Sequence, residues 1–186
     1  MILDGGHPGL LYCTSGEMQM ASEKTPRIAV VMGSDSDLKV MESCTEQLRE
    51  FGLQATVRIL SAHRTPQLAA EFAETAAQRG IQVIIAAAGM AAHLAGALAA
   101  RTTLPVIGVP LAADTGVGGL DALLSTVQMP PGVPVATMGT GKAGAKNAAI
   151  LAAEILALTD PALRDKLVEF RKRQEQAVRE KDAALG

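Results

Sequence analysis

Short apolar runs alternate with longer helix-forming segments along this chain, and this alternation constrains the fold more than any other feature. Strands are expected near Ile28, Thr56, Val83, Val106 and Val135, with a helix after each. Parallel strands need such crossover helices, and right-handed crossovers place the helices on both faces of the sheet. The sequence therefore predicts an α/β three-layer sandwich with a central parallel sheet, flavodoxin-like or Rossmann-like.

The 186 residues, 48% of them hydrophobic, suit a single domain with a sizeable core. Residues 1–25 are rich in glycine and have no basic segment followed by a long apolar one, so a flexible N-terminal extension is expected there. The α/β domain is assigned to residues 26–159. Asp160 and Pro161 are a typical helix start, so residues 160–186 are expected to form a C-terminal helix.

This terminal helix carries a short apolar stripe of Leu163, Leu167 and Phe170. The ion pairs expected along it, Glu169 with Arg173 and Glu175 with Arg179, contribute only about 0.2–0.5 kcal/mol each. Its order is therefore expected to need packing against another subunit, and a solvated helix that frays is the alternative.

Composition argues against several classes of partner. A formal net charge of −2 offers no bulk attraction to nucleic acid or to anionic membranes, and the chain has no Trp for stacking on bases. The two cysteines and three histidines have no metal-ligand spacing. We expect no metal, and a reducing cytoplasm as the compartment.

The loop Ser61-Ala62-His63-Arg64-Thr65-Pro66 follows the second predicted strand. Thr65 and Pro66 indicate the start of a helix that runs to Arg79, so His63 lies in a strand-to-helix connection, where α/β sheets bind ligands. Histidine titrates near neutrality and arginine binds anions. The structural alternative is that His63 only caps or packs against the helix.

A second candidate loop, Gly33 to Asp37, follows the first strand. Gly33 permits close backbone approach, and the hydroxyls of Ser34 and Ser36 are expected where free helix N–H groups point outward, a pattern that suits phosphate. It has neither the Walker nor the dinucleotide spacing. An ordinary helix cap with carboxylates at the positive end of the dipole is the alternative.

The third strand breaks at Gly89 into a helix of small residues, within the run from Ile84 to Gly96. Small side chains let a ligand or another backbone come close. His93 is interpreted as a helix-terminal residue, with a ligand or relay role as the alternative.

Together these loops resemble those of the class I PurE family, the N5-carboxyaminoimidazole ribonucleotide mutases of purine biosynthesis. The resemblance continues in order from Arg27 to the last helix. It includes the segments Gly33–Asp37, Ser61–Pro66, Ala91–Leu94, Leu104–Pro110, Gly119–Pro130, Gly132–Thr137 and Gly141–Gly144 with Asn147.

The chain also departs from the family pattern. Ala87 and Met90 stand where the family usually has glycine, and Ala95 where it usually has proline. The segment 112–118 is about one residue longer than usual and carries Asp114. The family's animal-type relatives, which carboxylate the free aminoimidazole with CO2, are similar but have lysine at the position of Arg64, so Arg64 favours the mutase class.

The resemblance implies an isomerase that moves a carboxylate from N5 to C4 of the imidazole, without a cofactor, in a homo-octamer whose terminal helices reach neighbouring subunits. His63 would be the catalytic acid and base. Ser34, Ser36 and Arg64 would bind phosphate, Asp37 the ribose hydroxyls and Ser61 a polar group of the substrate. The remaining substrate-binding residues would be Ala88, Gly89, Met90, His93 and Leu94.

Two alternatives stay open. A carboxylase of the same fold would act on free aminoimidazole ribonucleotide and CO2. A non-catalytic module would bind nucleotide phosphate through the same loops without chemistry.

Overall fold

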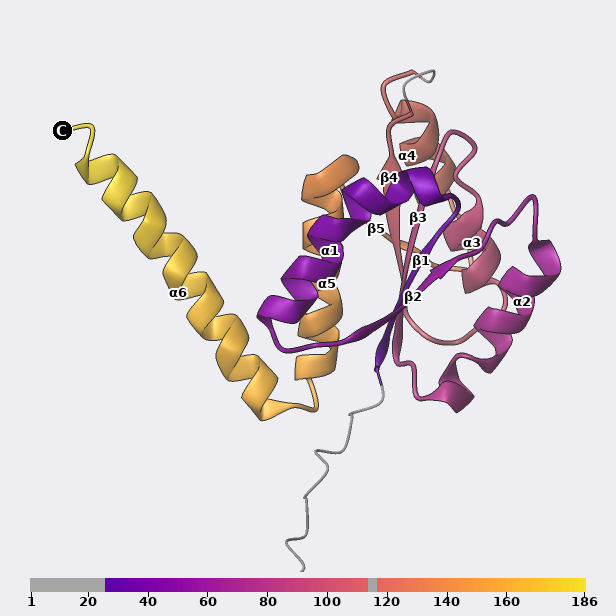
Figure 1. Cartoon of the computed structure of the whole chain (residues 1–186), viewed down its shortest axis with the longest axis horizontal. Coiled ribbons are helices and arrows are strands. Elements are labelled where there is room, and N and C mark those ends of the chain that lie inside the picture. Colours follow the sequence, from indigo (N-terminus) through magenta and orange to yellow (C-terminus); the bar gives the residue numbers. More distant parts are fainter. Residues whose placement is uncertain (1–25, 114–116) are drawn as a thin grey trace, which may run out of the picture.

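A computed structural model describes residues 26–113 and 117–186. Its centre is a five-stranded, wholly parallel sheet in the order β2-β1-β3-β4-β5 (Figure 1). The strands are β1 (Ile28–Met32), β2 (Ala55–Ile59), β3 (Val83–Gly89), β4 (Val106–Leu111) and β5 (Ala136–Thr137). The predicted three-layer sandwich is confirmed. Of the two expected forms, flavodoxin-like and Rossmann-like, the observed strand order is the flavodoxin-like one.

Successive side chains of the central strands point to opposite faces of the sheet, which is why these strands read as continuous apolar runs. In β1, Ile28 and Val30 enter one hydrophobic core, whereas Ala29 and Val31 enter the other. The whole of β1 is buried.

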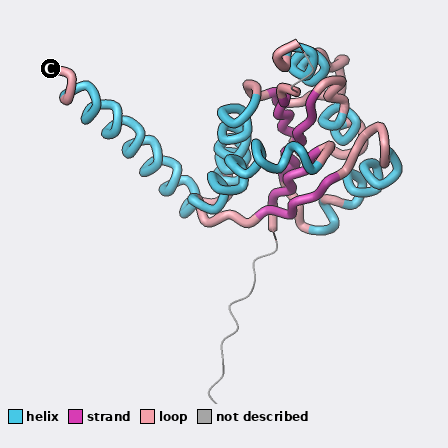
Figure 2. The backbone as a smooth tube through the Cα atoms, turned by 45° about the horizontal axis from the view of Figure 1, so that its top comes forward, coloured by secondary structure: helices cyan, strands magenta, loops and turns pink. Residues whose placement is uncertain are grey.

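Helices cover both faces of the sheet, as Figures 1 and 2 show. The first core holds α1 (Leu38–Glu50) and α5 (Gly141–Ala157), and the second holds α2 (Pro66–Thr75) and α3 (Leu94–Ala99). A further helix, α4 (Leu120–Val127), packs on β4. The short 3-10 turns are η1 (Asp35–Asp37) and η2 (Ala77–Arg79).

Two expected elements differ in detail. The helix predicted to run from Pro66 to Arg79 ends at Thr75 and is followed by η2, which closes at the left-handed Gly80. The strand expected near Val135 is only Ala136–Thr137, which pairs with β4 at the edge of the sheet. The expected N-terminal extension and Asp114 lie outside the described residues.

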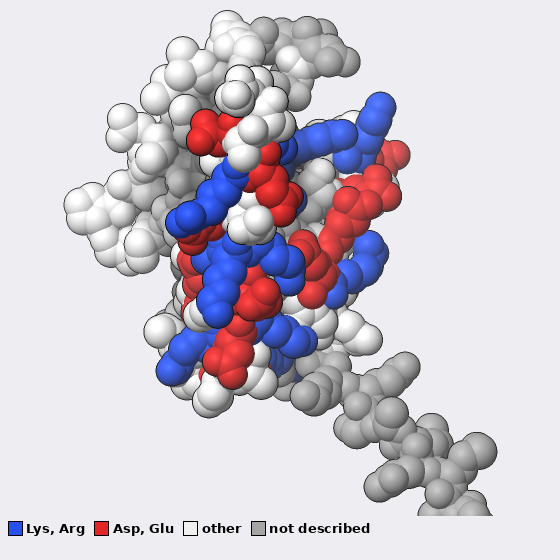
Figure 3. Space-filling model, turned by 90° about the vertical axis from the view of Figure 1, so that its left-hand side faces the viewer, with Lys and Arg blue, Asp and Glu red and all other residues white. Residues whose placement is uncertain are grey.

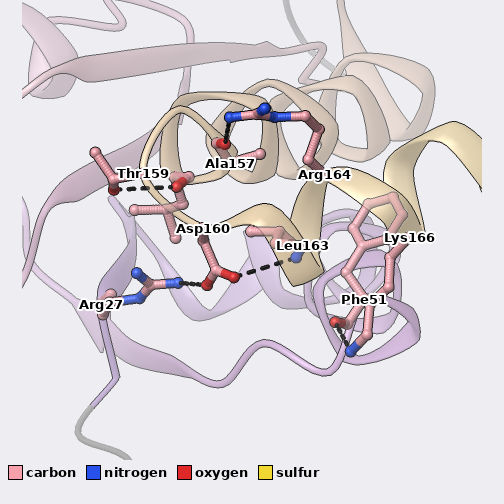
Figure 4. A network of polar contacts seen from close by, with 9 residues as sticks. Arg27, Phe51, Ala157, Thr159, Asp160, Leu163, Arg164 and Lys166 are labelled. Atoms are coloured by element: carbon pink, nitrogen blue, oxygen red, sulfur yellow. Dashed lines mark hydrogen bonds and ion pairs between the residues drawn. The ribbon is translucent and has the colours of Figure 1, made fainter.

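The C-terminal helix α6 (Pro161–Ala183) is anchored at its base (Figure 4). Asp160 accepts a hydrogen bond from the Leu163 N–H at 3.2 Å and pairs with Arg27 at 2.9 Å, and Lys166 donates to the Phe51 carbonyl at 2.8 Å. The Phe170 ring packs edge-on against Phe51, with 5.2 Å between centroids.

Apolar burial contributes most to this anchoring. Leu163 and Phe170 are 4% and 5% exposed, and burying such a side chain contributes about 1.5–3 kcal/mol. Exposed ion pairs contribute only about 0–1 kcal/mol. The expectation that α6 needs another subunit for its order is therefore wrong for its first three turns, which pack on the chain's own α1 and α5.

Beyond this base α6 extends away from the domain in both ribbon views (Figures 1 and 2). Every residue from Arg171 to Gly186 is exposed, and on this side of the molecule Lys and Arg intermingle with Asp and Glu (Figure 3). The Glu175–Arg179 pair forms as predicted.

The predicted pairing of Glu169 with Arg173 is wrong. Arg173 bonds Glu50 of α1 at 2.6 Å, and Glu169 lies 4.0 Å from Lys172. The docking of α6 on α1 offers Arg173 a carboxylate that a helix considered alone does not.

No helix among the described residues is long and apolar enough to cross a membrane.

Candidate active site

The carboxyl ends of β2, β1 and β3 are neighbours in the sheet, and each leads into one of the three loops singled out in the sequence. The chain crosses from β2 over β1 to β3, so this is the point where the strand order reverses, the usual ligand position in open α/β sheets. A cavity of about 520 Å³ lies here. All eleven predicted site residues line it: Ser34, Ser36, Asp37, Ser61, His63, Arg64, Ala88, Gly89, Met90, His93 and Leu94.

Main-chain hydrogen bonds hold the three loops in register. The Gly33 N–H donates to the Ala87 carbonyl at 3.1 Å, and the Leu60 N–H donates to the Met32 carbonyl at 2.9 Å. These bonds continue the strand pairing past the end of β1. The loops therefore start from a rigid edge, which suits the positioning of reactive side chains.

The Ser61 loop is closed by bonds within itself. Thr65 Oγ1 accepts from the Ser61 N–H at 2.9 Å and donates to the Ser61 carbonyl at 3.1 Å, and the Arg64 N–H donates to Ser61 Oγ at 3.1 Å. Thr65 is the N-cap residue of α2 as predicted, yet its side chain makes no cap bond to the helix. Its hydroxyl is used to tighten the turn that presents His63.

His63 and His93 meet across the cavity. His63 Nε2 lies 2.9 Å from His93 Nδ1, and the rings are nearly perpendicular with 5.0 Å between centroids. Both residues are exposed, and both line the cavity. The polar contact of His63 is thus to a residue 30 positions away in the chain and not to its own helix.

Arg64 reaches from the β2 loop to the β1 loop. Its Nη2 donates to the Gly33 carbonyl at 2.8 Å, which brings the guanidinium beside Ser34 and Ser36. An exposed cation at this position, together with hydroxyl groups, forms a polar wall that suits an anionic ligand.

The β1 loop differs from expectation in one respect. The Ser34 N–H donates to Asp37 Oδ2 at 3.0 Å, and the Ser36 N–H to Asp35 Oδ1 at 3.1 Å, so these N–H groups are not free for phosphate. Ser34 and Asp37 form a capping box, the arrangement proposed as the structural alternative. The serine hydroxyls and Arg64 remain as anion donors.

Burial raises the pKa of the Asp37 carboxyl above its ordinary value of 3.8. Hydrogen bonds from the Ser34 and Gly33 backbone and the Ser36 hydroxyl, and the nearby charge of Arg64, lower it only in part. Asp37 is therefore a partly desolvated acceptor at the cavity wall, a frequent property of ligand-binding carboxylates.

The third wall is the end of β3, where Ala88 and Gly89 still belong to the strand. A Cβ on Gly89 would lie 3.1 Å from the Leu111 carbonyl oxygen, so little space exists for a side chain there. Met90 follows with φ +56°, a left-handed conformation that L residues rarely adopt. His93 is the N-cap residue of α3, as its terminal position predicted, but its side chain makes no cap bond.

Sequence reasoning did not list four lining residues: Gly33, Ala62, Ala91 and Ala113. The first three lie inside the motifs already quoted, so motif membership could have found them. Ala113 follows β4, and no chemistry of an alanine marks it in a sequence.

Known proteins resemble this chain over most of its length. The sequence profile of a family described as AIR carboxylase matches residues 27–177. Relatives named N5-carboxyaminoimidazole ribonucleotide mutase include one from Mycobacterium tuberculosis, 52% identical over 90% of this chain and 94% of its own length. Another, from Bacillus subtilis, is 51% identical over 86% of this chain and 98% of its own length.

Among solved structures, PurE from Treponema denticola superimposes with a TM-score of 0.77 at 29% identity, covering 86% of this chain and 98% of that one. Family profile, relatives and solved structure thus agree over the region that contains the sheet and the cavity. The chain belongs to the AIR carboxylase family.

Proposed function

We propose that this protein is an N5-carboxyaminoimidazole ribonucleotide mutase, an isomerase that moves the carboxylate from N5 to C4 of the imidazole. The observation that carries the proposal is the pairing of His63 and His93 at 2.9 Å within a cavity that also presents Arg64. A group able to give and take a proton thus stands beside an anion site, and the relatives that match most of this chain carry the same name.

The polar wall binds the ribonucleotide in this proposal. Arg64 and the hydroxyls of Ser34 and Ser36 bind the 5′-phosphate, and charge-assisted bonds of this kind are the stronger hydrogen bonds in proteins. Asp37 accepts from the ribose hydroxyls. Ser61 holds the turn and contacts a polar group of the substrate, and the imidazole lies at the small-residue wall of Ala88 and Gly89.

His63 carries the chemistry by acting in both directions. When the bond between N5 and the carboxyl carbon breaks, the electron pair stays on N5 and His63 donates a proton there, which leaves CO2 and a neutral aminoimidazole. C4 then attacks the CO2, and His63 removes the C4 proton. One proton is given and one is regained, so the cycle closes without an external acid or base.

His93 positions His63. The contact between His63 Nε2 and His93 Nδ1 at 2.9 Å restricts the orientation of the His63 ring, and with it the direction in which that ring gives and takes the proton.

Two substrates test the proposal: N5-carboxyaminoimidazole ribonucleotide, or aminoimidazole ribonucleotide with labelled bicarbonate. A mutase converts the first quickly and places little label in the C4 carboxylate, because a bound pair reacts with the advantage of proximity. Rapid use of free aminoimidazole at low bicarbonate with full labelling would establish the carboxylase instead. Nucleotide binding without turnover of either would establish a binding module.

A homo-oligomer, an octamer by the family resemblance, is part of the proposal. The outer half of α6 has no contact that buries it, and an isolated helical segment of this length is marginal in water. Leu120, Leu124 and Val127 also form an exposed apolar stripe on α4. We place the protein in the cytoplasm, where a free cysteine such as Cys44 stays reduced.

A further inference from the structure

The side chain of Asp35 takes hydrogen bonds from the anion-binding loop although Asp35 does not line the cavity itself. Its Oδ1 accepts from the Ser34 hydroxyl at 3.1 Å and from the Ser36 N–H at 3.1 Å. Ser34 and Ser36 both line the cavity. One oxygen of an exposed carboxylate therefore engages one donor from each of the two serines proposed for the phosphate.

These donors can serve only one acceptor fully at a time. A hydroxyl group has a single hydrogen, so a bond from Ser34 to a phosphate oxygen requires that its bond to Asp35 breaks. The Ser36 N–H is already shared between Asp35 Oδ1 and Ser34 Oγ, the latter at 3.4 Å. A phosphate oxygen that uses these two donors must therefore displace the Asp35 carboxylate.

Other contacts hold the loop without Asp35. The Ser34 N–H donates to Asp37 Oδ2 at 3.0 Å, and the Asp37 N–H donates to the Ser34 carbonyl at 3.3 Å. The Gly33 N–H ties the loop to the Ala87 carbonyl in the next strand. The capping box thus depends on Asp37, and truncation of Asp35 should leave the loop folded.

The charge of Asp35 acts in the same direction as its hydrogen bonds. Among the described residues that line the cavity, Arg64 is the only lysine or arginine. A phosphate beside Ser34 and Ser36 meets the favourable charge of Arg64 and the like charge of the Asp35 carboxylate. A ligand without a phosphate meets neither effect at this wall.

We propose that Asp35 is an internal competitor of the substrate phosphate, which keeps the affinity of the phosphate site below the value that its other groups would give. The inference rests on the proposed mutase function and adds a residue that sets substrate affinity. The 5′-phosphate takes no part in the transfer between N5 and C4, so it binds alike in substrate and product. Binding of this uniform kind lowers KM without raising kcat.

Two substitutions separate the hydrogen bonds of Asp35 from its charge. Asp35→Ala removes both, whereas Asp35→Asn removes the charge and keeps an amide oxygen that can accept the same two bonds. Glu46→Gln is the matched control. It changes the net charge by the same amount as Asp35→Asn, and Glu46 is exposed on α1 and does not line the cavity.

The readout is the binding of aminoimidazole ribonucleotide and of its dephosphorylated nucleoside, measured by isothermal titration in buffer without bicarbonate. We expect Asp35→Ala to bind the nucleotide about 3- to 10-fold more tightly than the wild type, the scale of one competing hydrogen bond. Asp35→Asn should gain less, because its amide still competes for the donors. Binding of the nucleoside, and both affinities of Glu46→Gln, should stay at the wild-type values.

Nucleotide binding by Asp35→Ala that equals or falls below that of the wild type would overturn the competition. So would an equal gain for the nucleoside or in Glu46→Gln, or a gain in Asp35→Asn as large as in Asp35→Ala, because charge alone would then account for the effect. Failure of the proposed function is a separate result, since the wild type itself would then bind nucleotide and nucleoside alike or leave the carbamate unconverted.

Discussion

His63 and His93, 30 positions apart in the chain, share a hydrogen bond of 2.9 Å between Nε2 and Nδ1. His63 comes from the loop after β2 and His93 from the turn before α3, and β1 lies between β2 and β3 in the sheet. The pair therefore spans the cleft at the end of β1, directly beside the loop that carries Ser34 and Asp37.

Replacing His63 with Asn should lower turnover by about 10² to 10⁴, because the amide keeps one hydrogen bond but cannot carry a proton between N5 and C4. Nucleotide binding, followed by isothermal titration, should survive. Near-normal turnover in His63→Asn would remove His63 from the acid and base role.

His93→Leu should lower kcat by about 10- to 10²-fold with little change in KM, because the ring of His63 loses its partner and its orientation. His93→Asn is the matched variant, since its amide can lie near the position of Nδ1. Recovery of part of kcat by Asn and not by Leu identifies a positioning role. Equal loss in both would mean that the imidazole of His93 itself transfers a proton or binds substrate.

Arg64→Ala should weaken binding of the nucleotide by about 10- to 150-fold, the loss of a charge-assisted contact of about 1.5–3 kcal/mol. The dephosphorylated nucleoside is the control ligand and should bind both proteins alike. A loss of equal size for the nucleoside would show that Arg64 acts by holding the Gly33 carbonyl, to which it bonds at 2.8 Å, and not by binding phosphate.

Asp37→Asn should stabilise the fold near neutral pH while it weakens substrate binding. Burial raises the pKa of the Asp37 carboxyl in the folded state above 3.8, so the folded protein holds the proton more tightly than the unfolded chain does. The wild type therefore loses stability as pH rises from 3.8 through the raised pKa. The amide can keep the capping contact to the Ser34 N–H without the desolvated charge.

The melting temperatures of the wild type and Asp37→Asn, measured from pH 3 to 8, check this sign. Asp37→Asn should melt at a higher temperature than the wild type at pH 7, and this difference should vanish below pH 3.8. A difference in melting temperature that grows as pH falls would contradict a raised pKa of the Asp37 carboxyl.

Removing residues 174–186 should reduce the oligomer to smaller species while the domain keeps its melting transition. The cut lies beyond Phe170 and Arg173, so every anchoring contact of α6 on α1 remains. Light scattering gives the mass. An unchanged mass would assign the subunit contacts to other surfaces, such as the apolar stripe of α4.

Much of the fold was predictable because its signals are local. Each residue named for a strand lies in that strand or one residue from it, and Asp160-Pro161 located the start of α6. These signals work because backbone hydrogen bonding and caps depend on near neighbours in the chain. All eleven predicted site residues lie around one cavity for a related reason. Loops that follow parallel strands emerge at the same edge of a sheet.

Only the tertiary structure decided which groups touch. The order β2-β1-β3-β4-β5, the bond of Arg173 to Glu50 in place of Glu169, and the pairing of the two histidines depend on how distant elements pack. The same holds for Met90, whose sequence context indicates a helical or strand-end residue and whose φ of +56° is imposed by the turn between Gly89 and His93. Periodicity and helix caps indicate which structure one segment favours by itself. These contacts instead form between segments that are distant in the chain and are buried against one another only when it folds.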